Sequence, residues 1–388
     1  MDKLQSYCNT GDISKLRLVP SPIKEILLEI SPYALRKYKN NKGQYWERAA
    51  EILDILSEPD IHDENCKNLR GLKWVGNSCY LDSSLFSLFA VPTSFVDDNI
   101  INAILTPRLT TRFVCSANGS SQVDLENRQV VQNQLKTIVT HIRGRGLSNR
   151  DKYCTDLRGA LINCPNVENY YDNSMKDAGE FLTYILEMFD TNIAVKETIT
   201  YYTNNVTDEM PSVQDLVKSD NVNIDRSASI IQFVDSSRLL RYSNDNDHSI
   251  RQFLSDIDSA EFDEKNKPYY RDLTYNRRIS ITNLISTPYL IFRFQRLYTY
   301  GKKPLETRII PLQTLTLDID ARFMLSAIVV FQHQHYTCYF RCGNDWYFYN
   351  DIDNNEPIKI IGTYQNLLTS EPSPISGGTL YFYTPISS

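Results

Sequence analysis

One cysteine of the sequence stands where a nucleophile could be activated. After Cys79, the residues Leu81, Leu85, Leu88 and Phe89 follow at the spacing of one apolar helix face. This spacing places Cys79 at or just before the first helical turn, where the helix dipole favours a thiolate over a thiol of ordinary pKa, about 8.5. Cys79 is therefore a candidate nucleophile, and the alternative is a small apolar cysteine that fills a gap in the core.

A cysteine nucleophile needs a base, and the segment QHQHYTCYF supplies two of the five histidines, His333 and His335. His335 begins a predicted strand, and His333 lies in the loop before it. A rigid sheet can aim an imidazole, so His335 is the better-placed base. The other three histidines lie in a polar linker, on a charged helical stretch and in a polar segment, where structural or solvated roles are expected.

The base in turn needs an acceptor that fixes its tautomer and stabilises the imidazolium. Asn350 and Asp351 end the next predicted strand, 346–349, and the two strands form a hairpin through a Gly-Asn turn. Because the strand ends return to each other, either side chain can reach His335. The alternative is an Asn-Asp pair that only makes a turn.

A pair of carboxylates, Asp177 and Glu180, lies three residues apart on another predicted helix and so shares one helix face. An acidic first turn is by default a solvated surface that suits the helix dipole. The same pair can also bind arginine side chains through bidentate hydrogen bonds.

The elements that must position these residues change in character along the chain. Residues 1–65 predict a separable helical extension, and helical patterns dominate 79–195. Residues 203–265 are polar with few periodic apolar positions, which predicts an insert or an exposed subdomain. The predicted strands all follow residue 280 and cover 289–294, 323–331, 336–341, 346–349 and 380–383. Helices first and strands later predict an α+β fold.

Composition limits the class of protein. With 388 residues, 41% hydrophobic and 23% charged, the chain is expected to be globular with a core of its own. A net charge of −6 argues against nucleic-acid partners and suits a basic partner or peptide tail. No apolar run reaches the roughly 18 residues that would span a membrane, so no membrane partner is expected.

The cysteines are scattered through the sequence. Eight are present and none forms a C-x-x-C pair, which argues against a zinc ribbon. The N-terminus has no apolar signal core. Together these features predict free thiols in a reducing compartment, cytoplasmic or nuclear. The tyrosine- and asparagine-rich composition also fits a large DNA virus, whose protein would act in the host cytoplasm or the virion.

Taken in order, these segments resemble the motifs of the ubiquitin-specific proteases. Residues 71–89, GLKWVGNSCYLDSSLFSLF, resemble the cysteine box of that family, and 177–182, DAGEFL, its acidic helix motif. Residues 334–351 resemble the histidine box, while 288–297 and 377–383 resemble strands of the final sheet. The segments NSCYLDSSLFSLFA and VFQHQHY are most similar to the cylindromatosis-type branch, which prefers extended ubiquitin chains, including linear ones.

The resemblance covers about 70–388 and implies a papain-like cysteine protease fold. It implies a helical thumb, a palm of antiparallel sheet, and reduced or irregular fingers at about 203–265. The implied partners are ubiquitin or polyubiquitin chains and a ubiquitinated protein substrate. The implied reaction is hydrolysis of the isopeptide or peptide bond after the C-terminal glycine of ubiquitin through a thioester acyl-enzyme, with no cofactor.

The resemblance also implies roles for the candidate residues. Cys79 is the nucleophile, and His335 is the general base and then the general acid. Asn350 takes the orienting position, which is more often Asp in the family, and Asp351 is the alternative. The carboxylates of the acidic helix, Asp177 and Glu180, bind the arginines of the ubiquitin tail.

Two departures from the family pattern leave other functions open. Trp74 stands where the family often has an oxyanion-stabilising Asn, so Asn77 and the backbone N–H of Cys79 are the substitute donors. Losing one such donor costs roughly 10²–10³ in rate. The cysteine pairs that bind zinc in many members are absent, so no metal is expected. The alternatives are an inactive ubiquitin-binding pseudoenzyme or structural protein, and a protease for another ubiquitin-like modifier.

Overall fold

The computed structural model describes residues 64–386, with gaps. The gaps are 109–114, 117–118, 146–151, 165–168, 204–216, 230, 235, 241, 243–245, 251–252, 254–272, 282–288, 297–303 and 319–320. The helices predicted within 1–65 lie outside the described residues.

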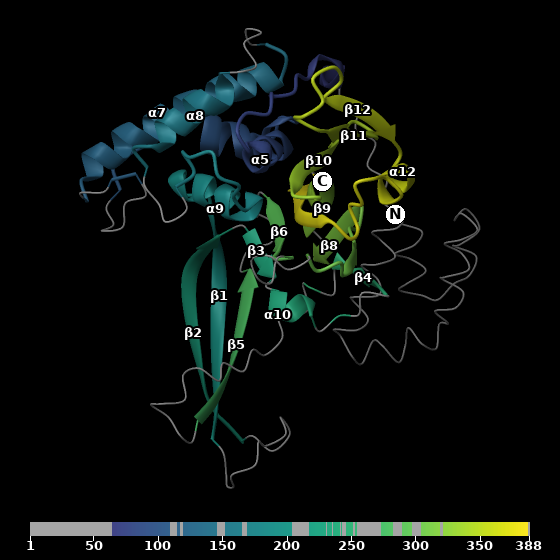
Figure 1. The fold of residues 1–388 in the computed structure, drawn as a ribbon. Coiled ribbons are helices and arrows are strands. Elements are labelled where there is room, and N and C mark those ends of the chain that lie inside the picture. Colours follow the sequence, from purple (N-terminus) through teal and green to yellow (C-terminus); the bar gives the residue numbers. More distant parts are fainter. Residues whose placement is uncertain are drawn as a thin grey trace.

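The first half of the described chain is helical, as predicted. Its helices are η2 (Glu64–Asn68), α5 (Cys79–Phe89), α6 (Ser94–Val96), η3 (Asp97–Ile101), α7 (Ser121–Ile142), α8 (Tyr153–Leu161) and α9 (Ala178–Met188). Figure 1 shows them gathered together beside the sheet. All eleven residues of α5 are buried, because it packs against α7 and α9 as well as strands β9 and β10. The predicted apolar face of α5 is therefore only part of a helix that is enclosed all round.

The second half forms an eight-stranded sheet in the order β12-β11-β10-β9-β13-β6-β3, with β8 also paired to β9. The bounds are β3 (Ile231–Val234), β6 (Leu290–Phe294), β8 (Thr314–Asp318), β9 (Ala321–Gln332), β10 (His335–Cys342), β11 (Asp345–Tyr349), β12 (Ile358–Gly362) and β13 (Gly378–Pro385). The pairs are antiparallel except β3 with β6. The strands predicted after residue 280 are confirmed, and with the helices they give the α+β fold.

Two tight turns hold β10 between its neighbours. His333 and Gln334 join β9 to β10 with φ of 52° and 58°, which is the left-handed backbone of a two-residue type I′ turn. The Gly-Asn turn joins β10 to β11 as predicted, with Gly343 at φ 64°. His335 is thus the first residue of β10, paired with Gln332.

A second, three-stranded sheet has the order β2-β1-β5 and projects away from the helices in Figure 1. It consists of β1 (Asn192–Thr203), β2 (Val217–Ser229) and β5 (Leu273–Ile281). Within the polar segment 203–265, the structure also places β3, α10 (Ser236–Leu239) and β4 (Asp247–Ser249), and β4 pairs with β7 (Arg308–Ile310). The segment is more regular than predicted, because ladders form between backbone groups and need no apolar periodicity.

Four cysteines are joined in disulfides, so the prediction that all are free is wrong for these. Cys66 pairs with Cys342 across 276 residues, because η2 lies against the end of β10. Cys115 pairs with Cys164 at the far ends of the packed helices α7 and α8. Spacing in the sequence gives no sign of either pairing. Free thiols in the described part of the chain are Cys79, Cys154 and Cys338.

The aromatic contacts between α5 and the β10–β11 hairpin fix the distance between the two candidate halves of the site. Phe86 stacks on Tyr349 with ring centroids 4.0 Å apart and meets Phe340 edge-on at 5.1 Å.

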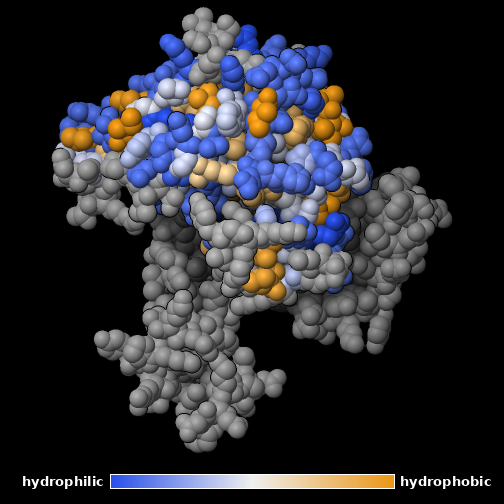
Figure 2. All heavy atoms as spheres, in the orientation of Figure 1, coloured by the Kyte–Doolittle hydropathy of each residue, from blue (hydrophilic) through white to orange (hydrophobic). Residues whose placement is uncertain are grey.

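The surface over the helices is mostly hydrophilic in the view of Figure 2, with apolar side chains in small separate groups. Apolar side chains are therefore buried mainly between the helices and the sheet.

The remaining short helix, α12 (Tyr364–Leu368), follows β12. No single helix among the described residues is long and apolar enough to cross a bilayer. The bent pair Cys79–Phe89 and Ser94–Ile101 meets that test only when both helices are counted together.

Candidate active site

Cys79 opens α5, as predicted, and a braced turn leads into it. Gly76 and Asn77 both have left-handed backbone, with φ of 51° and 58°. From α8, the guanidinium of Arg158 donates to the carbonyl oxygens of Val75 at 3.0 Å and Gly76 at 2.9 Å. The turn is therefore held from outside the helix, and Cys79 enters the core with only 3% of its surface exposed.

Burial decides the charge of the nucleophile in the resting structure. Loss of hydration raises the pKa of the Cys79 thiol to about 11, and the nearby Asp351 and Asp82 carboxyls push it the same way. A hydrogen bond from the backbone of Tyr336, the residue after His335, acts against this rise. Burial therefore favours the thiol form of Cys79, whereas the helix position favours the thiolate.

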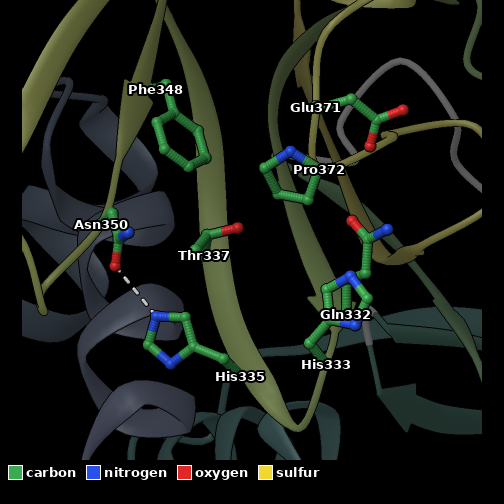
Figure 3. A pocket seen from close by; sticks show the side chains of 8 residues that line it. All are labelled: Gln332, His333, His335, Thr337, Phe348, Asn350, Glu371 and Pro372. Carbon is green, nitrogen blue, oxygen red and sulfur yellow. Dashed lines mark hydrogen bonds between the residues drawn. The ribbon is translucent and has the colours of Figure 1, made fainter.

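The structure brings His335 together with both candidate acceptors. Its Nε2 lies 2.9 Å from Oδ1 of Asn350 and 3.4 Å from Oδ1 of Asp351, as Figure 3 shows for the first contact. Oδ1 of Asn350 also accepts the backbone N–H of Ile352 at 3.2 Å. Because both neighbours of Nε2 are acceptors, Nε2 carries the ring proton. The lone pair is then on Nδ1, which is the form a general base requires.

Asp351 differs from Asn350 in its surroundings. It is 1% exposed, and burial raises the pKa of its carboxyl. Its carboxyl group lies close to that of Asp82, which belongs to α5 and is fully buried. Burial also raises the pKa of Asp82 well above its ordinary value. Sequence reasoning missed Asp82, although an acid three residues after the candidate nucleophile, inside an apolar run, was a visible signal.

The remaining candidate beside Cys79 is Asn77. Its side-chain amide donates from Nδ2 to the carbonyl oxygen of Asn173 at 2.9 Å. Trp74, which replaces the expected Asn, is 40% exposed, and its backbone N–H donates to the carbonyl oxygen of Asp351 at 3.3 Å. The loop before Cys79 is therefore tied both to the helical side and to the hairpin that carries His335.

Asp177 and Glu180 lie together, as predicted, but already share an internal arginine. Asp177 caps α9 by accepting the backbone N–H of Glu180 at 2.8 Å. From β6, Nη2 of Arg293 lies 3.2 Å from Oδ1 of Asp177 and 3.0 Å from Oε1 of Glu180. Gly179 makes room for this arginine, since a Cβ there would lie 2.5 Å from its Cδ. Two carboxylates sharing one guanidinium leave a net charge of about −1 at this surface.

An open cavity of about 380 Å³ adjoins the His335–Asn350 contact (Figure 3). Its lining residues are Gln332, His333, His335, Thr337, Phe348, Asn350, Glu371 and Pro372. Within the described residues, no three His, Cys, Asp or Glu side chains gather as they would around a metal ion. The side chains that line the cavity include the imidazoles of His333 and His335 and the carboxyl group of Glu371.

Comparison with known proteins gives one family and one fold. A family model described as ubiquitin carboxyl-terminal hydrolase matches residues 70–360. A search of curated protein sequences finds no match. Among solved structures, the chain is similar to the Ubp8-Sgf11-Sgf73-Sus1 SAGA DUB module, with a TM-score of 0.54 and 14% identity over 92% of this chain and 75% of that one. It is also similar to the Ubp8/Sgf11/Sus1/Sgf73 module bound to ubiquitin aldehyde, with a TM-score of 0.52 and 14% identity over 90% of this chain and 76% of that one.

Proposed function

The chain belongs to the ubiquitin carboxyl-terminal hydrolase family, and we propose that it is an active thiol-dependent deubiquitinase. It hydrolyses the isopeptide or peptide bond that follows the C-terminal glycine of ubiquitin. The observation that carries this proposal is the contact of the Cys79 sulfur with the backbone of Tyr336, the residue that follows His335 in β10, together with the contact between Nε2 of His335 and Asn350.

The roles of the side chains follow from their protonation states. Because Cys79 rests as a thiol, Nδ1 of His335 removes its proton as the sulfur attacks the glycine carbonyl carbon. The imidazolium then gives this proton to the leaving lysine amine as the C–N bond breaks, and a thioester remains. His335 next activates a water molecule, which attacks the thioester and releases the ubiquitin carboxylate and the thiol. Asn350 orients His335, and the Asp351 carboxylate stabilises the imidazolium.

Oxyanion stabilisation has two proposed donors. The backbone N–H of Cys79 is one, and the amide of Asn77 is the other, through the hydrogen that it does not give to Asn173. Because Trp74 supplies no side-chain amide, we expect slower turnover than in relatives with an Asn at that position.

The acidic pair is the proposed site for the arginines of the ubiquitin tail. Asp177 and Glu180 remain 32% and 43% exposed while they bind Arg293, so each keeps acceptor capacity toward solvent. Replacing Asp177→Arg should sharply raise KM for ubiquitin substrates, since it puts a cation beside Arg293 and would repel a basic tail. An unchanged KM would show that the tail binds elsewhere or that the substrate is another modifier.

Within the family, we place the chain beside the cylindromatosis-type branch. The support is the segment NSCYLDSSLFSLFA together with the short type I′ turn at His333 and Gln334, which contains no glycine. This placement predicts faster cleavage of extended ubiquitin chains, including linear ones, than of compact chains at equal concentration. A panel of defined di-ubiquitins tests it, and equal rates for all linkages would contradict it.

The activity itself is tested with a ubiquitin probe that carries a C-terminal electrophile. We expect a covalent adduct with the full chain, no adduct with Cys79→Ala, and an unchanged adduct with Cys154→Ala, a second buried free thiol. Reversible ubiquitin binding without an adduct would identify a pseudoenzyme. Neither binding nor adduct would point to another ubiquitin-like modifier or to a structural role.

A further inference from the structure

The buried carboxyl groups of Asp82 and Asp351 lie together behind His335. Asp82 is fully buried and Asp351 is 1% exposed, and their carboxyl groups lie close enough to interact. Oδ2 of Asp82 accepts the hydroxyl of Ser78 at 2.5 Å, and Ser78 accepts the backbone N–H of Val75 at 2.9 Å. Among the described residues, Oδ1 of Asp82 receives no hydrogen bond from an N–H group or a hydroxyl, whereas the Asp351 carboxyl also lies against the backbone N–H groups of Asp351 and Ile352 and against Nε2 of His335.

One proton shared by the two carboxyl groups removes their mutual repulsion and supplies the missing hydrogen-bond donor. Two ionised carboxylates in contact are both acceptors and repel each other, most strongly where water is excluded. A carboxylic acid beside a carboxylate makes a short, charge-assisted hydrogen bond instead. The pair must therefore hold one proton and one negative charge, like other carboxyl dyads that share a site.

We propose that Asp82 carries this proton and donates it to Asp351, which stays ionised next to Nε2 of His335. The geometry favours this direction, since Asp351 is the partner that faces the imidazole, at 3.4 Å. Asp82 has its other oxygen occupied by the Ser78 hydroxyl, as the carbonyl oxygen of a carboxylic acid would be. The preference of buried Asp82 for its neutral form agrees with this direction. Asp82 is then a positioning residue, which acts on His335 through Asp351.

Few other charges face the pair in the described structure. From α8, Arg158 is the near cation, but its guanidinium is hydrogen-bonded to Val75, Gly76 and Asn173. The other titratable neighbours are Cys79 on α5, Cys154 on α8, Cys338 and His335 on β10, and Tyr349 on β11. Burial raises the pKa of each of these thiols and of Tyr349, which keeps them neutral near pH 7. The shared proton therefore sets how much charge Asp351 presents to the imidazole.

Two substitutions distinguish a neutral, protonated Asp82 from an ionised one. Asp82→Asn keeps an oxygen for Ser78 and supplies a permanent N–H to Asp351, so kcat should stay within about threefold of the parent enzyme. Asp82→Ala removes the donor, which lets the pKa of Asp351 rise and lowers kcat at least about tenfold near neutral pH. The acid limb of its pH–rate profile should move to higher pH by about one unit. The dissociation constant for ubiquitin should be unchanged in both variants, because residue 82 is fully buried and does not reach the surface.

A spectroscopic measurement tests the pair independently of turnover, which matters because the kinetic test rests on the proposed function. In infrared difference spectra near pH 7.5, the full chain should show a protonated-carboxyl carbonyl band that Asp82→Asn lacks. The control Asp353→Asn removes a partly exposed carboxyl whose pKa is lowered to about 2, and should leave this band unchanged.

The outcomes are distinguishable. A band that disappears in Asp82→Asn, in a chain that does not cleave ubiquitin, would leave the proton-sharing pair standing and overturn only the proposed function. Absence of the band from the full chain would overturn the pair. A loss of kcat in Asp82→Asn as large as in Asp82→Ala would overturn it as well, because Asp82 would then be needed as an anion.

Discussion

Alkylation of Cys79 as a function of pH tests whether the resting nucleophile is a thiol. Burial raises the pKa of Cys79 to about 11, well above that of an exposed cysteine. At about pH 8 the thiolate fraction is then roughly 10⁻³, about a hundredfold below that of an unperturbed cysteine. A more basic thiolate is also a better nucleophile, by roughly eightfold for two pKa units, so the net rate should be about tenfold lower than in an unfolded reference. Restricted access to the sulfur lowers the rate further.

The measurement is the rate of iodoacetamide labelling of Cys79, followed by mass spectrometry of its peptide. A synthetic peptide spanning 77–89 is the unperturbed reference, and Cys79→Ser identifies background labelling. In the folded chain, the rate should rise about tenfold per pH unit from about pH 7 to 9.5 without levelling, while the peptide levels off near its own pKa. Circular dichroism at each pH shows that the chain stays folded. A folded chain whose rate levels off below about pH 8.5 would refute the reasoning, since Cys79 would then rest as a thiolate paired with the imidazolium of His335.

Four further substitutions test three other contacts. If Asn350, which holds Nε2 of His335 at 2.9 Å, is the main orienting residue, Asn350→Ala should lower kcat more than Asp351→Ala. Steady-state kinetics of both variants test this, and a larger loss from Asp351→Ala would reverse the assignment. Gly179→Ala should cost about 1–3 kcal/mol in urea unfolding, because its Cβ would displace Arg293, and an unchanged midpoint would show that the arginine adapts freely. Phe86→Ala should cost about 3–5 kcal/mol, since the ring is fully buried, and a loss below about 1 kcal/mol would show that α5 does not depend on this contact.

The parts of the site that sequence could predict are those fixed by local patterns. The start of α5 at Cys79 follows from helical spacing, and the position of His335 follows from a hairpin whose turns are short. The contact between α9 and Arg293 depends on β6, which lies more than a hundred residues further along the chain. No periodicity in either segment indicates that pairing. The Cys66–Cys342 disulfide was missed for the same reason.

The effect of burial on Cys79 could not be predicted from the sequence for a different reason, because two effects of one position oppose each other. A helix N-terminus stabilises a thiolate, but the effect of a helix end is typically only about 0.3–1 kcal/mol at the surface and about 2 in favourable buried sites. Burial of a charged group costs more than this. Sequence shows the helix start plainly but does not show that α5 is enclosed on every side. The sequence therefore indicated the smaller effect, that of the helix dipole, but not the larger one, the cost of burying the charged sulfur.

Enclosure of α5 also explains why its acid must be neutral. The packing of Phe86 on Tyr349 holds α5 against the hairpin, and this brings Cys79 to β10 and Asp82 to Asp351. A helix held that tightly cannot hydrate an ionised Asp82, so the side chain is stable there only if it keeps a proton and finds an acceptor. Asp351 is that acceptor, and in turn it needs a donor in order to stay ionised beside His335. The contact that aligns nucleophile and base thus also fixes the protonation of the acids behind them. Asp82→Ala and Phe86→Ala should therefore affect this enzyme in different ways: the first through the pH dependence of its activity, the second through its stability.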